Sequence, residues 1–139
     1  MVCKMLIFKE YNEYKETEIL GLYTSVGWSN YTREPDMLRR AFSNSLYALA
    51  AFDNDKLIGL IRAVGDGASI IFIQDLLILP EYQRRGIGSR LLQILMKKYK
   101  KVYQLQLLTD ASMKNIAFYE AVGLKKSSDL NCCAFMRVQ

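Results

Sequence analysis

The fold of this chain is decided by residues 70–92, which read IIFIQDLLILPEYQRRGIGSRLL. The first part of this stretch is a long apolar strand that ends at Pro80, a residue that cannot donate a backbone hydrogen bond to a sheet. A loop with two arginines and two glycines follows and opens an apolar helix. Exposed backbone N–H groups and the positive end of the helix dipole meet at such a point. The stretch therefore predicts a phosphate-binding site between a strand and a helix.

Two other kinds of phosphate loop fit this sequence less well. A dinucleotide-binding turn would have Gly or Ala in place of Leu91, and it would belong to an opening β-α-β unit rather than follow a hairpin. Asp110 lies about 20 residues beyond Gly88, where that fold has a ribose-binding acid, but only 29 residues remain after it. A Walker loop requires Gly-Lys-Ser/Thr, which is absent. Both alternatives are therefore disfavoured.

The length and composition predict one domain over residues 1–139. Of these residues 51% are apolar and 24% are charged, as in a soluble globular protein. No apolar run reaches the ~18 residues that a membrane span requires, and the first ten residues alternate like a strand without a signal-peptide cleavage site. We therefore expect a cytoplasmic protein that does not bind membranes.

Histidine is absent, and the three cysteines (Cys3, Cys132 and Cys133) lack the spacing of a zinc site. The sequence therefore predicts no metal site and no nucleophile activated by histidine. Proton transfer would fall to carboxylates, tyrosine, lysine or water. The net charge is +5, and four lysines cluster within residues 97–101. Because cations at the end of a helix also complement its dipole, we do not predict a nucleic-acid partner from this cluster.

Hydrophobic periodicity and turn residues predict alternating strands and helices along the chain. Strands are expected over residues 1–9, 46–52, 56–64, 69–79 and 102–108, with one or two closing strands within 132–138. Helices are expected over 14–26, 35–44, 87–99 and 115–121, and a loop over 28–32. An antiparallel meander that feeds one β-α-β crossover requires a mixed sheet. The predicted fold class is α/β (α+β), with a mixed, mostly antiparallel central sheet of six to seven strands and helices on both faces.

Two short stretches carry a family resemblance: the loop QRRGIG, residues 83–88, and the stretch NIAFYEAVGL, residues 115–124. They resemble motifs of the GNAT superfamily of acetyl-coenzyme-A-dependent N-acetyltransferases. The loop matches the family's Gln/Arg-x-x-Gly-x-Gly/Ala signature fully. The second stretch is similar to the family's Asn-x-x-Ala-x-x-Phe-Tyr-x-x-x-Gly-Phe element, although it lacks two residues between Ala and Phe. The motifs stand in the family's order, and the similarity covers residues 46–124. The resemblance implies a GNAT-like fold and an acyltransferase.

The resemblance also implies where the coenzyme binds. The pantetheine arm would lie between two splayed strands and bond to the backbone of the first, and the N–H groups of residues 84–89 would hold the pyrophosphate. The implied coenzyme-binding residues are Leu77, Ile78, Leu79, Gln83, Arg84, Arg85, Gly86, Ile87, Gly88, Ser89, Asn115 and Tyr119. Two alternatives stay open: either Arg84 or Arg85 contacts the pyrophosphate, and Asn115 either binds the coenzyme or caps its helix.

Transfer of an acetyl group from a thioester to an amine requires a base for the ammonium, a donor for the oxyanion and an acid for the departing thiolate. The resemblance implies the backbone N–H of Leu77 as the donor and the phenol of Tyr119 as the acid. Asp75 is the candidate base, acting directly or through water, because an acid inside an apolar strand is costly unless it is paired or functional. The alternatives for Asp75 are an exposed position at a strand bulge and an ion pair with an arginine such as Arg62.

The acceptor pocket of the family is framed by the first two helices and the loop between them. Trp28 and Tyr31 lie in that loop, where they can form a wall for an amine or pack the first helix onto the sheet. With Asp75 they are the predicted substrate residues. The predicted activity is transfer of acetyl from acetyl-CoA to a primary amine of a small molecule, with a peptide or protein acceptor and a non-catalytic acyl-CoA-binding module as alternatives. We expect a monomer or a homodimer.

Overall fold

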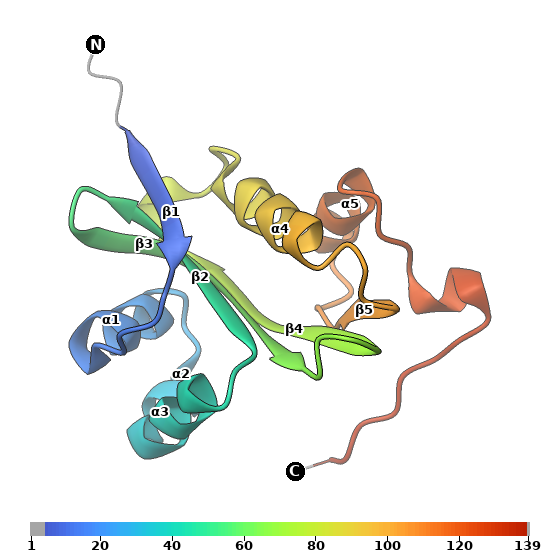
Figure 1. Ribbon diagram of the computed structural model, residues 1–139, viewed down its shortest axis with the longest axis horizontal. Coiled ribbons are helices and arrows are strands. Elements are labelled where there is room, and N and C mark those ends of the chain that lie inside the picture. Colours follow the sequence, from blue (N-terminus) through green and yellow to red (C-terminus); the bar gives the residue numbers. More distant parts are fainter. Residues whose placement is uncertain (1–4, 139) are drawn as a thin grey trace. The chain divides into compact units, whose positions relative to one another are not determined.

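The computed structural model describes residues 5–138, in which strands and helices alternate along the chain (Figure 1). The strands are β1 Leu6–Glu10, β2 Tyr47–Asp53, β3 Lys56–Gly65, β4 Ile70–Ile78 and β5 Gln104–Leu107. The α-helices are α1 Glu16–Ser25, α2 Ser29–Thr32, α3 Pro35–Ser43, α4 Ile87–Lys98 and α5 Met113–Ala121. Short 3-10 helices occupy Pro80–Tyr82 and Ser127–Leu130. The chain divides into two compact units, unit 1 up to Leu108 and unit 2 from Thr109 onward. The expectation of a single domain stays a prediction.

The sheet is mixed and mostly antiparallel, as predicted, but smaller than predicted. Its strand order is β1-β2-β3-β4-β5; the first three pairs are antiparallel and β4 pairs with β5 in parallel. Within the described residues it has five strands, so the prediction of six to seven was wrong. The difference lies in residues 132–138. Their apolar side chains favour a strand, but among the described residues no backbone hydrogen bond pairs them with a strand. The predicted first strand lies partly outside the described residues.

The antiparallel meander predicted from the strands over residues 46–79 is formed, with a turn at each end of β3. Asn54 joins β2 to β3 with a left-handed φ of 55°, a conformation that Asn tolerates in tight turns. Between β3 and β4 the Oδ1 atom of Asp66 accepts hydrogen bonds from the N–H groups of Ala68, Ser69 and Ile70. The Ser69 hydroxyl and these N–H groups hold the pKa of Asp66 well below its usual value. The turn thereby aligns the start of β4.

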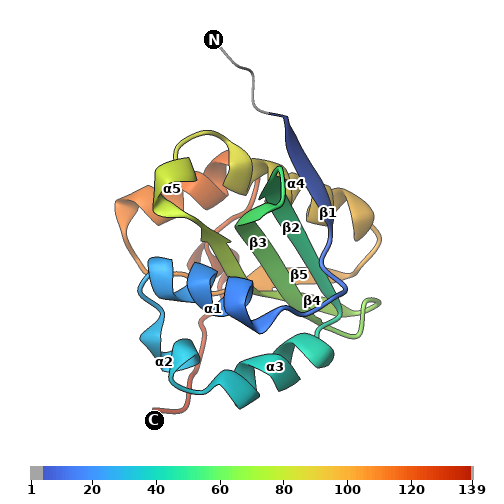
Figure 2. The same ribbon diagram turned by 90° about the vertical axis from the view of Figure 1, so that its left-hand side faces the viewer.

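Helices cover both faces of the sheet, as predicted. Helices α1 and α3 lie on one face and α4 on the other (Figure 1), and Figure 2 shows α1 running across its face. Helix α1 buries an apolar stripe against β3 and β4 and α4 buries one against β2, β3 and β4, because apolar residues recur every three or four positions in each. The buried helix residues are Ile19, Leu22, Tyr23 and Leu38 on the first face, and Ile87, Leu91, Leu92 and Leu95 on the second.

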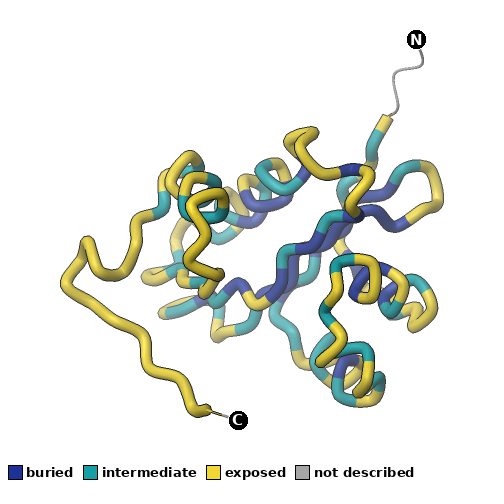
Figure 3. Tube along the Cα trace, turned by 180° about the vertical axis from the view of Figure 1, so that it is seen from behind, coloured by how far each residue is buried: buried dark blue, intermediate teal, exposed yellow. Residues whose placement is uncertain are grey.

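Unit 2 differs from unit 1 in burial. It contains α5 and the 3-10 helix Ser127–Leu130, and none of its described residues is buried (Figure 3). From residue 125 to residue 138 every residue is exposed. In the part of the chain that the structure describes, no helix combines the length and the apolar character that crossing a membrane requires.

Candidate functional site

Strand β4 has two halves that differ in their neighbours. Residues Ile71–Ile73 pair with β3 on one side and with β5 on the other, and Ile70 pairs with β5. The register with β3 then shifts between Arg62 and Ala63, which leaves Gln74 as an extra residue in a β-bulge. Beyond the bulge the strand pairs with β3 alone, and no described strand lies along its other edge. The second half of β4 therefore presents an open strand edge.

The direction of the backbone groups along this open edge follows from one hydrogen bond. The N–H of Leu79 donates to the carbonyl oxygen of Ile58 at 2.9 Å. This bond continues the β3–β4 register, in which the next pair is Gly59 and Ile78. In an antiparallel strand the backbone N–H and C=O of one residue point to the same side, and the side alternates from residue to residue. The backbone groups of Leu77 therefore also face β3. The backbone groups of Leu76 and Ile78 face the open edge. Gln83 supports this direction, since its Nε2 atom donates to the carbonyl oxygen of Ile78 at 3.0 Å.

The loop after β4 leaves an uncapped helix N-terminus. Arg84 has a φ of 63° and Gly86 a φ of 79°, so the backbone turns sharply twice before α4 begins. No side chain caps the helix at Gly86, and the first N–H groups of α4 have no acceptor within the helix. A Cβ atom at Gly86 would meet no heavy atom within 4 Å, so the space beside it is open. N–H groups with the helix dipole behind them can bind an anion, so this loop is a candidate anion site.

The two arginines of the loop differ in their contacts. The guanidinium of Arg85 lies 5.2 Å from the centre of the Tyr82 ring, and a cation–π contact holds it there. Among the described residues, the side chain of Arg84 makes no hydrogen bond, ion pair or ring contact. Arg84 is therefore the arginine that is free to meet an anion at the loop.

A buried ion pair lies just beyond the bulge. Arg62 and Asp75 are paired across β3 and β4, and both are buried. The Oδ2 atom of Asp75 accepts hydrogen bonds from Arg62 Nε and Tyr23 Oη, each at 2.7 Å, and Arg62 Nη1 donates to Ser45 Oγ at 3.1 Å. This is the arginine pairing that the sequence left open for Asp75. The Oδ1 atom of Asp75 is also buried but has no hydrogen-bond partner among the described residues.

The charge states of this cluster follow from its burial. Burial, and then the charge of Asp75, raise the pKa of Tyr23 far above its usual value, so its hydroxyl stays a neutral donor. Burial alone would lower the pKa of Arg62, but the neighbouring carboxylate outweighs it and the net shift is upward. Arg62 thus stays charged and balances Asp75. A buried oxygen without a donor costs free energy, so Oδ1 is the atom of the cluster that can accept one more hydrogen bond.

Aromatic rings extend the cluster towards solvent. The ring centre of Tyr23 lies 5.4 Å from that of Tyr31 and 6.0 Å from that of Trp28. The Nε2 atom of Gln74, the bulge residue, donates to Tyr31 Oη at 3.1 Å. The structure therefore brings all three predicted substrate residues together, with Trp28 and Tyr31 around the tyrosine that holds Asp75. The predicted loop over 28–32 contains the short helix α2, which places these two rings.

Sequence reasoning missed the part that Tyr23 and Ser45 play in this cluster. Tyr23 lies within the helix predicted over residues 14–26, and no hydrogen-bond partner was predicted for its hydroxyl. The signal that could have found it is its hydroxyl, because a tyrosine on the buried face of a helix requires a hydrogen-bond partner. Ser45 carries no such signal, since serine is common after a helix end.

Unit 2 contains the predicted residues Asn115 and Tyr119 on α5. Ser112 caps this helix by accepting the N–H of Asn115 at 3.2 Å, and the Asn115 side-chain amide donates to Asp110 Oδ1 at 2.9 Å. Tyr119 is half-buried, and burial and then the charge of Asp110 raise its pKa above the usual value. Its phenol donates no hydrogen bond to any described residue. Tyr119 is therefore a protonated phenol at neutral pH.

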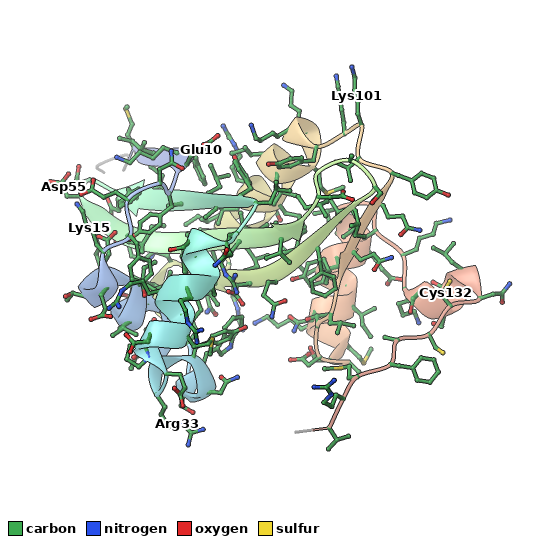
Figure 4. The ribbon with its side chains drawn as sticks, turned by 60° about the horizontal axis from the view of Figure 1, so that its bottom comes forward. Glu10, Lys15, Arg33, Asp55, Lys101 and Cys132 are labelled. Atoms are coloured by element: carbon green, nitrogen blue, oxygen red, sulfur yellow. The ribbon has the colours of Figure 1, made fainter. Side chains whose placement is uncertain are left out.

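A separate hollow of about 360 Å³ lies beside the β2–β3 turn. Its charged lining residues are Lys9, Glu10, Glu13, Lys15, Glu18 and Asp55, and Figure 4 shows Glu10, Lys15 and Asp55 gathered at one end of the sheet. None of the predicted site residues lines it. Within residues 5–138 no group of three His, Cys, Asp or Glu side chains is placed to hold a metal ion.

Comparison with known proteins gives consistent matches along the chain. A model of the acetyltransferase (GNAT) family matches residues 7–124. An N-acetyltransferase of Prochlorococcus marinus named ycf52-like is 30% identical over 135 residues, which are 93% of this chain and 73% of that protein. The structure of a GNAT family acetyltransferase of Streptococcus pneumoniae has a TM-score of 0.88 and 41% identity over 97% of this chain and 98% of that chain. The PaiA N-acetyltransferase of Thermoplasma acidophilum, solved with coenzyme A, shares the fold at a TM-score of 0.72 and 20% identity over 87% of this chain and 90% of that chain.

Proposed function

Because the chain belongs to the GNAT family of acetyltransferases and is an acyltransferase, we propose that it transfers acetyl from acetyl-CoA to a primary amine of a small molecule. The observation that carries the proposal is the open edge of β4 followed by an uncapped helix N-terminus. The edge offers hydrogen bonds to an extended arm, and the helix offers N–H groups to a pyrophosphate at the end of that arm. No other segment of unit 1 combines the two among the described residues.

The proposed coenzyme contacts follow the direction of the backbone. The N–H groups of Leu76 and Ile78 would face the pantetheine and thioester, and the N–H groups of residues 84–89 would face the pyrophosphate. The expected oxyanion donor therefore moves from Leu77 to Leu76, because the alternation along β4 turns Leu77 towards β3. Arg84 adds a charge-assisted contact, since Arg85 is already held over Tyr82.

The acceptor would bind where the aromatic rings meet Asp75. Trp28 and Tyr31 offer two neighbouring aromatic rings to the amine, and Asp75 Oδ1 is the one buried oxygen of the cluster that lacks a donor. An amine N–H would satisfy this oxygen and point the nitrogen lone pair towards the open edge of β4. Oδ1 would then accept the amine proton directly or through water, while Arg62 and Tyr23 hold Oδ2 in place.

Each step of the transfer has a proposed residue. Acetyl-CoA supplies the activated acyl group. The amine nitrogen forms the new bond to the acyl carbon, Leu76 N–H stabilises the charge on the acyl oxygen, and the carbon–sulfur bond breaks. Tyr119 would donate its phenolic proton to the departing sulfur, and its raised pKa keeps that proton available at neutral pH. Asn115 is already bonded to Asp110, which supports a role in shaping the start of α5.

Calorimetry with acetyl-CoA and a thiol-release assay over a panel of amines test the proposal together. We expect micromolar binding and turnover with at least one small amine. Turnover only with peptides or proteins would favour the alternative acceptor. Binding without turnover across the whole panel would favour a non-catalytic acyl-CoA-binding module, and no binding would contradict both readings.

The acid role has a matched control in the same chain. Tyr119→Phe should lower kcat about 10²-fold with the coenzyme Kd unchanged, because one proton donor is lost and no binding contact is. Tyr99 is another half-buried tyrosine whose pKa burial raises, so Tyr99→Phe should leave kcat unchanged. Equal kcat values for wild type and Tyr119→Phe would remove Tyr119 from the mechanism.

The remaining features of the proposal concern the setting of the enzyme. We propose that it acts in the cytoplasm, without a metal and without nucleic-acid or membrane partners. The net charge of +5 is small, and Lys97 and Lys98 lie in the last turn of α4, where they complement the helix dipole. Binding of DNA or RNA that weakens steeply with salt would contradict this part of the proposal.

A further inference from the structure

The proposed base lies where its proton cannot leave by itself. Asp75 is 1% exposed, and in the proposed function, on which this inference rests, it takes one proton from the ammonium group of the acceptor in each turnover. Arg62 and Tyr23 hold its Oδ2 atom, and neither can take that proton on. The guanidinium of Arg62 has donors only, and Tyr23 is fully buried with its hydroxyl turned to Asp75. The site therefore requires another group that connects Asp75 with solvent.

Tyr31 is placed to make this connection. Its ring centre lies 5.4 Å from that of Tyr23, whose hydroxyl bonds to Asp75, but Tyr31 itself is only half-buried. Burial raises the pKa of the Tyr31 hydroxyl, the hydrogen bond from Gln74 lowers it, and the charge of Asp75 raises it again, so the net shift is upward. The hydroxyl therefore stays protonated at neutral pH, and it lies close enough to Asp75 to respond to its charge.

The β-bulge brings Gln74 to the same face of the sheet as Asp75. In a regular strand, consecutive side chains point to opposite faces. Gln74 is the extra residue of the bulge, so this alternation is interrupted between it and Asp75. The Nε2 atom of Gln74 reaches Tyr31 on α2 while Asp75 reaches Tyr23 on α1, and the two tyrosine rings are in contact. The bulge thus places an amide donor next to the proposed base.

The hydrogen bond from Gln74 limits what the Tyr31 hydroxyl can do. A phenolic hydroxyl has one hydrogen and two acceptor positions. The Nε2 atom of Gln74 donates to Tyr31 Oη at 3.1 Å and occupies one acceptor position. One hydrogen and one acceptor position remain, and they can face Asp75 and solvent in either order. A hydroxyl held in this way can accept a proton on one side while it gives up its own on the other.

We propose that Tyr31 carries the acceptor's proton from Asp75 to solvent, and that Gln74 is the positioning residue that prepares Tyr31 for this transfer. An N–H bond of the ammonium group breaks and an O–H bond forms at Asp75 Oδ1. The proton on Oδ1 then passes to Tyr31 Oη, directly or through one water molecule, while Oη releases its own hydrogen to solvent water. Asp75 is then a carboxylate again, Tyr31 again has one hydrogen, and one proton has left the site.

Tyr31→Phe tests the exit route, because it keeps the ring beside Trp28 and removes only the hydroxyl. In weakly buffered solution we expect kcat to fall about 10²-fold, with the KM for acetyl-CoA unchanged. Imidazole is a small proton carrier, so raising its concentration should restore kcat in the variant and leave the wild type unchanged. A loss that imidazole does not restore would mean that Tyr31 only shapes the acceptor site. A normal kcat would mean that the proton leaves elsewhere, and either result overturns the proposal.

Gln74→Met tests the positioning role and has a matched control on β5. Methionine has a similar length but no donor, so the loss of one hydrogen bond should lower kcat about tenfold, less than Tyr31→Phe, and imidazole should restore it. Gln106 is also exposed, and its Nε2 atom also donates to a side-chain oxygen, Gln104 Oε1, at 3.3 Å. Gln106→Met should therefore leave kcat unchanged. Equal kcat values for the two methionine variants would overturn the role of Gln74.

An NMR titration distinguishes a failure of this proposal from a failure of the proposed function. The Cζ signal of isotopically labelled Tyr31, assigned from its absence in Tyr31→Phe, reports the pKa of the hydroxyl without any turnover. The N–H of Gln74 stabilises the ionised form, so Gln74→Met should raise this pKa further. An unchanged pKa would overturn the positioning role whether or not the enzyme is active. No turnover by the wild type with any amine would contradict the proposed function and the exit route with it, whereas a normal kcat in Tyr31→Phe contradicts the exit route alone.

Discussion

The two halves of β4 are both rich in apolar residues, but they differ in their neighbouring strands. Residues 71–73 have a strand on each side, and their backbone groups are used within the sheet. Residues 75–78 pair with β3 alone and keep one edge open. One strand is therefore held on both sides at one end and keeps one edge unpaired at the other. The bulge at Gln74 is where the change occurs.

The buried ion pair marks the same boundary. Arg62 and Asp75 are neighbours across β3 and β4 directly beyond the bulge, and Tyr23 ties them to α1. Buried ion pairs add little net stability compared with apolar residues, but removing one partner is costly. The ion pair is therefore better explained by where it holds the Asp75 carboxylate, beside the open edge, than by a gain in stability. The predictions below are ordered from the largest expected effect to the smallest.

Arg62→Met should have the largest effect on stability. It leaves the buried Asp75 carboxylate without its counter-charge, and such a loss costs about 3–5 kcal/mol in the free energy of unfolding. Urea denaturation measures it. The double variant Arg62→Met with Asp75→Leu should recover part of the loss, because no charge is then buried. If the free energy of unfolding falls less in the single variant than in the double variant, the buried carboxylate does not depend on Arg62 as described.

Ile71→Ala probes the half of β4 that is paired on both sides. Ile71 is fully buried, so the loss of its side chain should lower the free energy of unfolding by about 3 kcal/mol. The acetyl-CoA Kd of the folded fraction should not change, because Ile71 lies before the bulge. Calorimetry at a temperature where the variant is folded checks this, and a weakened Kd would mean that the two halves are not independent.

Leu76→Pro probes the open edge of the other half. Its N–H faces away from β3, so proline removes no ladder bond but should weaken acetyl-CoA binding about tenfold by removing one donor to the ligand. Leu76→Ala is the matched control, because it loses the same side chain and keeps the N–H. Equal Kd values for the two variants would contradict the assigned backbone direction. Thermal unfolding confirms that both variants fold.

Gly86→Ala probes the loop that follows. A φ of 79° is unfavourable for alanine, so the substitution should cost about 1–2 kcal/mol and weaken acetyl-CoA binding as the loop distorts. Gly21 lies inside α1 with a helical φ and open space around its Cβ position. Gly21→Ala should therefore stabilise the protein by about 1 kcal/mol and leave binding unchanged. Equal changes in stability and in acetyl-CoA affinity for the two alanine variants would contradict a binding role of the loop.

Asp66→Asn should have the smallest effect, and one that depends on pH. Asp66 has a folded-state pKa below its unfolded value of about 3.9. Its contribution to stability is thus fully present above about pH 4 and is lost as the pH falls through the folded-state pKa. The difference in urea midpoint between wild type and variant should shrink between pH 5 and pH 2. A constant difference over that range would rule out the charge of Asp66 as its source.

Local patterns predicted the elements of unit 1 well, and contacts distant in sequence were predicted less well. The strand–Pro80–loop–helix order and both hairpin turns depend on neighbouring residues, and the structure contains each of them. Gln74 as a bulge and Tyr23 as a partner of Asp75 depend on the register of β3 and the packing of α1, which no local pattern encodes. The prediction of a sixth and a seventh strand was wrong for a related reason. The tail has the composition of a strand, but a strand requires a neighbour to pair with.

The sequence by itself determined the chemistry that this chain can offer. It placed an apolar strand, a glycine loop and a helix start in one order, and it contains no histidine. It also identified Asp75 as an acid within an apolar strand, where a carboxylate is costly unless it is paired or functional. Only the tertiary structure decided how these parts act: which backbone groups of β4 stay open, which oxygen of Asp75 stays free, and which arginine is left without a partner. The physical reason is that backbone direction and hydrogen-bond pairing depend on strand register and packing between distant segments, whereas residue type and turn geometry are local.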